Sequence, residues 1–138
     1  MIRLVDISDA PLDVGQMYDA VTAASAGGVA VFVGTVRETD DGRPVRTLGY
    51  SAHPSAVDVL HGVVQEVVDA HDVVAVAAVH RVGDLVVGDI AVVVALSCAH
   101  RGDAFVACRA LIDAIKSRVP IWKHQVFADG TEEWVGTP

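Results

Sequence analysis

Two runs of aliphatic residues constrain the fold of this chain more than any other feature. Val73–Val79 and Ile90–Leu96 each hold seven consecutive apolar residues. Such runs are typical of strands that are covered on both faces, and they are far shorter than the ~20 residues of a membrane-spanning helix. We therefore expect a buried sheet in which these runs, extended to His80 and Cys98, form the two richest strands.

Two segments in the first half of the chain carry the spacing of amphipathic helices. The first runs from about Pro11 to Gly27, and Ser8 or Asp9 can cap its start. The second begins after a cap at Ser55, and its apolar residues fall on one stripe. Because a one-sided apolar stripe needs a partner surface, we expect the second helix to pack on the sheet.

A third helix is predicted from about Asp103 to Arg118, with Phe105 among its inward-facing residues. Pro120 prevents the helix from continuing. Further strands are expected at Val29–Val36, at Val45–Ser51 as its partner, at Ile121–Phe127 and at Glu133–Val135. Helices and strands interleave without a break in composition, which favours a single compact domain over residues 1–138. Its class is α+β or α/β, with a mixed or antiparallel sheet and three main helices.

The overall charge limits the partners that this chain can have. Its net charge is −8 and it has no basic cluster, which argues against binding to DNA or RNA. An acid, Asp6, follows the start before any signal-peptide apolar run, so we expect a cytoplasmic protein with reduced Cys98 and Cys108. The 52% hydrophobic content exceeds what a core of this size requires and indicates a subunit interface as well.

Lysine is rare in this chain, which makes the segment from Lys116 to Lys123 informative. Eight arginines are spread over the sequence, but these two positions hold its only lysines. An ammonium shifts its pKa when it is desolvated and can transfer a proton, whereas a guanidinium in effect stays charged. The alternative is that one lysine is a solvated helix end and the other an exposed strand residue.

His100-Arg101 directly precedes the third helix, where unpaired N–H groups favour an anion such as phosphate. In the alternative interpretation, Asp103 caps the helix and Arg101 is a solvated loop residue. Cys98, His100 and Cys108 lack the spacing of metal ligands, so no metal is expected. His80 ends an apolar strand and is interpreted as a structural histidine.

Four motifs in order resemble the large, catalytic subunit of molybdopterin synthase. They are Phe32-Val33-Gly34-Thr35-Val36-Arg37, His80-Arg81-Val82-Gly83-Asp84-Leu85 with Gly88-Asp89, Ala99-His100-Arg101, and Lys116–Lys123 with Trp134. The resemblance runs from about Val29 to Trp134. The run Lys-x-x-x-Pro-Ile-Trp-Lys together with His-Arg is its most specific part.

This resemblance implies an α/β hammerhead fold and a sulfurtransferase that adds two sulfurs to cyclic pyranopterin monophosphate, giving the dithiolene of molybdopterin. It implies no cofactor. The implied partners are a second copy of the subunit and a small ubiquitin-like sulfur carrier with a C-terminal Gly-Gly thiocarboxylate, which together form a heterotetramer.

The resemblance also implies the site residues. The substrate-binding positions are Thr35, Val36, Arg37, His100, Arg101, Lys116, Lys123, His124 and Gln125. Lys116 is expected to act as general acid/base or as electrostatic partner of the thiocarboxylate, with Lys123 in support. Both reactants are anionic, so an acidic protein must concentrate positive charge locally to bring them together.

The sequence departs from the family pattern at two places. The family commonly has Glu at the position of Gln125, and often acids around Tyr50, where this chain has Gly49 and Ser51. The alternative function is therefore a non-catalytic module of the same fold that binds anions and the carrier without turnover.

Helix geometry predicts where the site is assembled. Arg101 and Lys116 lie ~15 residues apart along one helix, which corresponds to roughly 20 Å at ~1.5 Å per residue. One small substrate cannot bridge that distance within one chain. We therefore expect two composite sites per dimer, each with Arg101 from one subunit and Lys116 from the other.

Overall fold

The two aliphatic runs form neighbouring antiparallel strands at the centre of a four-stranded sheet in the computed structural model, which describes residues 1–136. They are β5 (Val73–Arg81) and β7 (Ile90–Cys98). The strand order is β1-β5-β7-β2, with β1 (Ile2–Ser8) parallel to β5 and β2 (Gly28–Thr35) antiparallel to β7. β2 thus forms one edge of this sheet.

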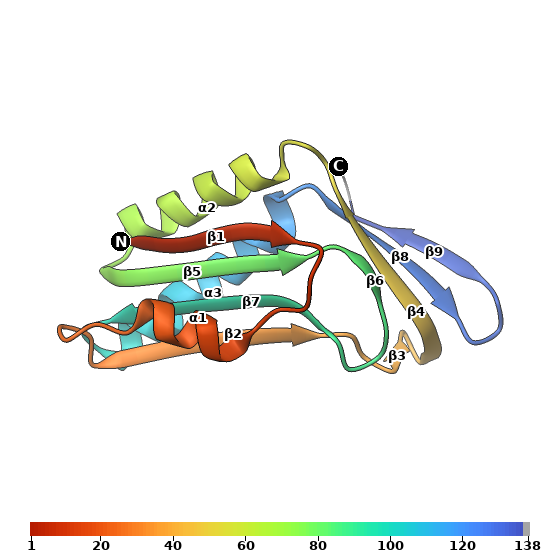
Figure 1. Ribbon diagram of the computed structural model, residues 1–138, viewed down its shortest axis with the longest axis horizontal. Helices are drawn as coiled ribbons and strands as arrows, with labels where there is room; N and C mark the ends of the chain where they lie inside the picture. The colour runs from red at the N-terminus through yellow and green to blue at the C-terminus, as the bar shows by residue number, and fades with distance from the viewer. Residues whose placement is uncertain (137–138) are drawn as a thin grey trace.

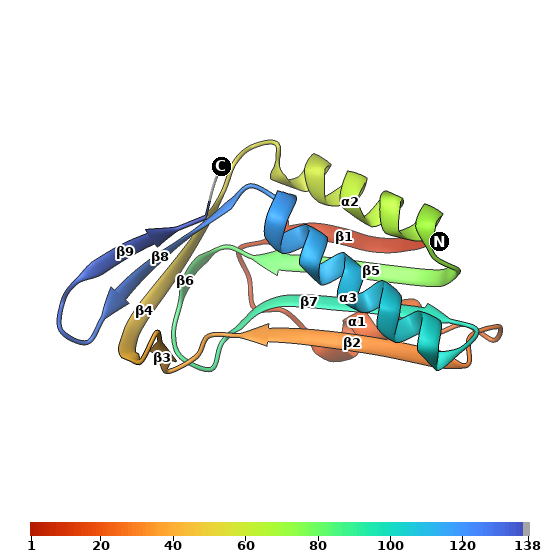
Figure 2. The ribbon, with the colours of Figure 1, turned by 180° about the vertical axis from the view of Figure 1, so that it is seen from behind.

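Helices cover both faces of the sheet, so the aliphatic strands are buried as their composition predicts (Figure 1). α1 (Val14–Val21) packs on one face. α2 (Ala56–Ala70) and α3 (Arg101–Arg118) pack on the other, where they meet the larger apolar cluster. Figure 2 shows α3 lying along the sheet beside β7 and β2.

A second sheet stands at the end of the first, beside the C-terminal end of α3 (Figure 1). Its main strand order is β3-β4-β8-β9, and β6 also pairs with β4. Its strands are β3 (Thr39–Asp40), β4 (Arg43–Ala52), β6 (Gly83–Leu85), β8 (Ile121–Phe127) and β9 (Glu132–Val135). The expected α+β class with three helices is confirmed.

Three predictions about the first half of the chain were wrong. β1 was not expected, because its Arg3 and Asp6 interrupt the apolar pattern, yet it gains a full parallel ladder with β5. The first helix is shorter than predicted, since Asp13 caps it by accepting from the Gln16 N–H at 3.1 Å. The strand at Val45–Ser51, part of β4, pairs with β8 instead of β2.

Two details of the helix ends also differ from expectation. Ser55 takes the cap position of α2, but its hydroxyl contacts His53 Nδ1 at 2.8 Å and caps no helix N–H. α3 begins at Arg101, with His100 at the cap position, and Phe105 is 67% exposed instead of facing inward.

None of the helices in residues 1–136 is long and apolar enough to span a bilayer.

Candidate active site

Two adjoining clefts form where the second sheet meets the end of α3. The larger, of about 360 Å³, contains Arg37 and is called the arginine cleft; the smaller, of about 190 Å³, contains His80 and is called the histidine cleft. Tyr50, Lys116 and Lys123 line both clefts. The two lysines therefore stand at the junction between the clefts.

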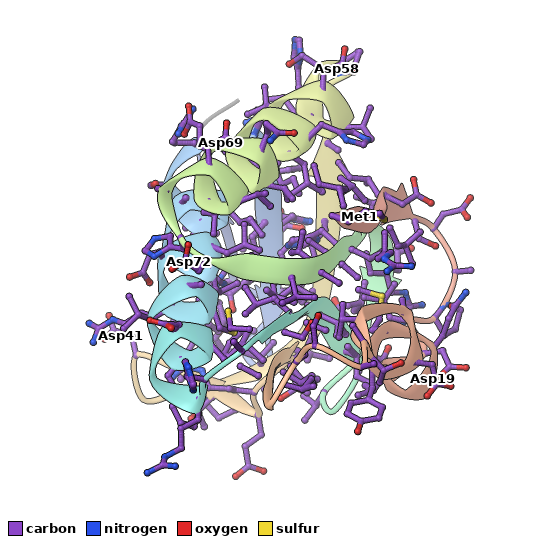
Figure 3. The ribbon with its side chains drawn as sticks, turned by 90° about the vertical axis from the view of Figure 1, so that its left-hand side faces the viewer. Met1, Asp19, Asp41, Asp58, Asp69 and Asp72 are labelled. Carbon is purple, nitrogen blue, oxygen red and sulfur yellow. The ribbon has the colours of Figure 1, made fainter. Side chains whose placement is uncertain are left out.

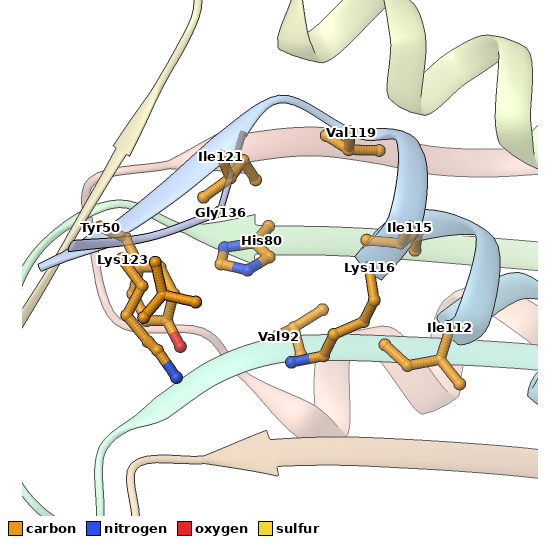
Figure 4. Close-up of a pocket in the computed structure, with 11 residues that line it drawn as sticks. Tyr50, His80, Val92, Ile112, Ile115, Lys116, Val119, Ile121, Lys123 and Gly136 are labelled. Atoms are coloured by element: carbon orange, nitrogen blue, oxygen red, sulfur yellow. The ribbon is translucent and has the colours of Figure 1, made fainter. Parts of the chain in front are cut away.

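The chain brings the lysines together by reversing direction between them. α3 ends at Arg118, Pro120 follows, and β8 starts at Ile121, so Lys116 on the helix and Lys123 on the strand face the same space (Figure 4). Within residues 1–136, neither ammonium has a carboxylate within ion-pair distance. Both positive charges remain available to an anionic ligand.

Lys116 is the more strongly perturbed of the two lysines. Its side chain is accessible from solvent, but it runs among Ile112, Ile115 and Val92 along the wall of the histidine cleft. Desolvation lowers the pKa of Lys116, and the nearby charges of Lys123 and Arg37 lower it further. A lowered pKa makes an ammonium a better proton donor, as acid/base chemistry near neutral pH requires.

Asp40 organises the arginine cleft. The buried Gln125 side chain donates to Asp40 Oδ2 at 2.6 Å, and Arg37 Nη2 lies 3.3 Å from Asp40 Oδ1. The hydrogen bond from Gln125 holds the pKa of Asp40 below its usual value, with further lowering by Lys123, Arg37 and Arg43. Asp40 therefore stays ionised and forms an ion pair with the exposed side chain of Arg37, which follows β2.

His80 lies between the sheets at the end of β5 and is 7% exposed. Its Nδ1 lies 2.7 Å from the carbonyl oxygen of Arg81, and the Tyr50 ring packs edge-on at a centroid distance of 4.9 Å. Burial lowers the pKa of His80 to about 4, against a smaller opposing effect of the Arg81 carbonyl and with Lys116 adding to the lowering. At neutral pH this imidazole is uncharged.

The structure brings six of the nine predicted substrate-binding residues to one cleft. Thr35, Val36, Arg37, Lys116, Lys123 and Gln125 all line the arginine cleft. His100 and Arg101 lie at the opposite end of α3, and both are exposed. His124 alternates to the other face of β8, where it stacks on Trp134 with ring centroids 4.3 Å apart.

Phe32, Asp40, Tyr50 and His80 line the clefts but were absent from the predicted set. His80 had a usable signal, because it is the first polar side chain after the apolar run Val73–Val79. Tyr50 and Asp40 had none, because their approach to the lysines depends on the pairing of β4 with β8.

Part of the negative charge of the chain lies away from the clefts, although Asp40 lines one of them. Figure 3 shows Asp19, Asp58, Asp69 and Asp72 at the surface around α1 and α2, and all four residues are exposed. Within residues 1–136, no three His, Cys, Asp or Glu side chains are arranged to hold a metal ion. The clefts are thus local cationic regions on an acidic molecule, suited to an organic anion.

The fold and this site define an α+β protein that presents an unpaired pair of lysines and an arginine to an anionic ligand. A family described as MoaE protein matches residues 7–118. The molybdopterin synthase catalytic subunit 1 of Mycobacterium tuberculosis is 40% identical over 131 residues, which cover 94% of this chain and 88% of that protein. The chain therefore belongs to the MoaE family, whose named relatives are molybdopterin synthase catalytic subunits.

Solved structures agree with this assignment. Molybdopterin synthase from Staphylococcus aureus matches with a TM-score of 0.88 and 34% identity over 96% of each chain. A chain in a complex of subunits 1 and 2 of molybdopterin-converting factor from Helicobacter pylori has the same fold, with a TM-score of 0.72 and 20% identity over 99% of this chain and 93% of that one.

Proposed function

We propose that this chain is the catalytic subunit of a molybdopterin synthase. It transfers two sulfurs from a thiocarboxylated carrier protein to cyclic pyranopterin monophosphate and so forms the dithiolene of molybdopterin. The observation that carries this proposal is the unpaired lysine pair at the junction of two clefts, in a chain that belongs to the MoaE family. The arginine cleft, at about 360 Å³, falls in the ordinary range for small-molecule sites.

The roles of the residues follow from their positions. Arg37, which pairs with Asp40, binds the anionic end of the pterin, with Thr35 and Val36 as the wall of the cleft. Lys116 is the acid/base group at the reacting centre and Lys123 supports it by charge. Gln125 acts through Asp40, and His124 fastens β9 to β8 through its stack on Trp134.

His100 and Arg101 enter the site from a second copy of the chain. β2 and α3 run side by side: a Cβ added to Gly28, at the start of β2, would lie 2.9 Å from the Cα of Arg101. At their other ends, Thr35 and Lys116 line one cleft. Antiparallel pairing of β2 with its copy therefore brings Arg101 of the partner subunit to Lys116.

The surface along β2 suits this pairing. β2 is a sheet edge with free backbone groups, and exposed apolar residues lie beside it on both elements. Val29, Val31, Phe32 and Phe105 line a groove of about 570 Å³ between β2 and α3. A second subunit would bury this apolar surface and cover the edge.

The sulfur carrier is the second proposed partner. The Helicobacter pylori structure of the same fold contains two subunits, which supports a two-component enzyme. The histidine cleft adjoins the lysines, so a carrier tail entering it would deliver its terminal thiocarboxylate beside Lys116. We place this reaction in the cytoplasm, where Cys98 and Cys108, both free and buried, stay reduced.

One reconstitution tests the function. The purified chain is mixed with a thiocarboxylated carrier and the cyclic pterin, and dithiolene product is measured. We expect product with the wild-type chain and none with Lys116→Ala. Binding of both reactants without product would instead establish the non-catalytic module, and failure to bind either would reject the proposal.

A further inference from the structure

The histidine cleft contains a hydrogen-bond acceptor without a partner. The Arg81 carbonyl has no proton to give, so His80 Nδ1 carries the ring proton and donates it over 2.7 Å. Nε2 consequently keeps its lone pair. In the part of the chain that the structure describes, Nε2 has no protein donor within hydrogen-bond distance, and it is not among the solvent-sealed polar atoms, so it is open to the cleft.

The matching donor lines the same cleft. Lys116 has no hydrogen-bond or ion-pair partner among residues 1–136, and Figure 4 shows its side chain and the His80 ring bordering one space. The lysine stem is flexible, whereas His80 is held by its bond to Arg81, by the Tyr50 ring and by a strand position opposite Val92. In this structure the ammonium lies beyond hydrogen-bond distance of Nε2, and a turn of the flexible lysine stem would bring the mobile donor to the fixed acceptor.

We infer that His80 is a positioning residue for Lys116, with Nε2 accepting a hydrogen bond from the ammonium once the lysine stem turns toward it. This inference rests on the function proposed above. The other groups around Lys116 are Arg37 after β2, Lys123 on β8, Tyr50 on β4 and Asp40 across the arginine cleft. Arg37 and Lys123 oppose the charged ammonium, so a bond to His80 offsets part of their effect.

Two substitutions separate this role from a structural one. In His80→Asn the side-chain amide reaches the Nδ1 position and keeps the donor to Arg81 but removes the acceptor. In His80→Gln the amide oxygen reaches the Nε2 position and keeps the acceptor but loses the Nδ1 donor. We expect His80→Asn to lower kcat at least tenfold and His80→Gln to retain kcat within about threefold. His61→Asn, on the exposed face of α2, is the matched control.

A second readout does not depend on turnover. The chain has two lysines, so ¹³C labelling of lysine side chains gives two signals whose titration reports each pKa directly. Lys123→Arg assigns them. Because a hydrogen bond accepted from the ammonium favours its charged form, His80→Asn should shift the Lys116 titration to lower pH, and His80→Gln should leave it near the wild-type position.

The outcomes are separable from those of the reconstitution. If wild-type chain makes product but His80→Asn matches it in kcat and in the Lys116 titration, the inference fails while the function stands. If His80→Gln is the more damaged variant, His80 is structural and the inference fails. Should both variants unfold, Lys116→Met is used instead: the ¹⁵N signal of His80 Nε2 must then change, and an unchanged signal overturns the inference.

Discussion

Lys116 differs from the arginines of this chain in the chemistry that it can perform. Its pKa is lowered by desolvation and by two neighbouring cations, and it has no carboxylate partner within residues 1–136. A guanidinium at this position would keep the charge but could not release a proton near neutral pH. The acid/base role proposed for Lys116 therefore requires lysine and not arginine at this position.

We expect Lys116→Arg to be nearly as damaging as Lys116→Ala, with turnover reduced by about 100-fold or more in both. Steady-state turnover in the reconstituted reaction measures this. Arg46→Lys, an exchange at an exposed position of β4, is the control and should leave turnover unchanged. If Lys116→Arg kept most of the activity, Lys116 would act by charge alone.

The hydrogen bond from Gln125 to Asp40 can be tested by substitution, because a similar bond from Gln65 to Asp69 on the surface of α2 provides a control. Gln125→Glu would place a second carboxylate against Asp40, where Gln125 now donates at 2.6 Å. The pKa of one of the two acids must then rise. When the pKa of a carboxyl group is higher in the folded chain than in the unfolded chain, the protein loses stability as pH rises from the lower pKa to the higher one. The variant should therefore be less stable at pH 8 than at pH 5, by roughly 1–3 kcal/mol.

Turnover should also fall in Gln125→Glu, since the added charge draws Arg37 and Lys123 away from the substrate. Gln65→Glu is the matched control: Gln65 donates to Asp69 at 2.9 Å on the exposed side of α2. At that exposed position water screens the two like charges, so we expect the free energy of unfolding to change by only a few tenths of a kcal/mol. Denaturant unfolding at the two pH values measures both variants; equal effects would show that the Asp40 pair is not special.

His80 predicts a second dependence of stability on pH. Its pKa is about 4 in the folded chain, against an ordinary value of 6.5 for histidine, so between these values the unfolded chain binds more protons. Stability is therefore lost as pH falls from 6.5 to 4, by about 3 kcal/mol, with Lys116, Lys123 and Tyr50 as the titratable neighbours. In His80→Asn the slope of unfolding free energy against pH should flatten over this window. An unaltered slope would show that other groups cause the pH dependence.

At the scale of elements, the strands and helices with a strong local pattern were predictable and their pairing was not. β5, β7 and α3 follow from aliphatic runs and helical spacing. β1 was missed because its burial comes from a ladder to residues more than 70 positions away. The pairing of β4 with β8 was missed for the same reason, and Asp40 and Tyr50 were missed with it.

The contact between β2 and α3 is the element-scale feature that would align the proposed composite site. Gly28→Ala would put a methyl group 2.9 Å from the Arg101 Cα, so backbone must move, at a cost of about 1–3 kcal/mol. Gly62→Ala in α2 meets nothing within 4 Å and should stabilise the chain by up to about 1 kcal/mol. Thermal unfolding compares the two; a neutral Gly28→Ala would show that the helix can shift freely.

At the scale of the whole molecule, the length of α3 separates Arg101 from Lys116, the two halves of the proposed composite site. Arg101→Ala and Lys116→Ala should each be nearly inactive alone. After subunit exchange, a mixed dimer has one site with both lesions and one with neither, so about a quarter of wild-type activity should return to an equal mixture. Exchange is verified by mass spectrometry of differently labelled subunits. If exchange occurs and no activity returns, both residues act within one chain.

The unpaired state of Lys116 has a consequence for chemical labelling. Reagents that acylate amines react with the neutral form, and the lowered pKa of Lys116 increases that form at any given pH. The chain offers few other amines: Lys123 stands in the same cleft, and the terminal ammonium of Met1 is held by the Val74 carbonyl at 2.7 Å. A general amine reagent therefore has three targets in this chain, and two of them lie in the proposed catalytic cleft.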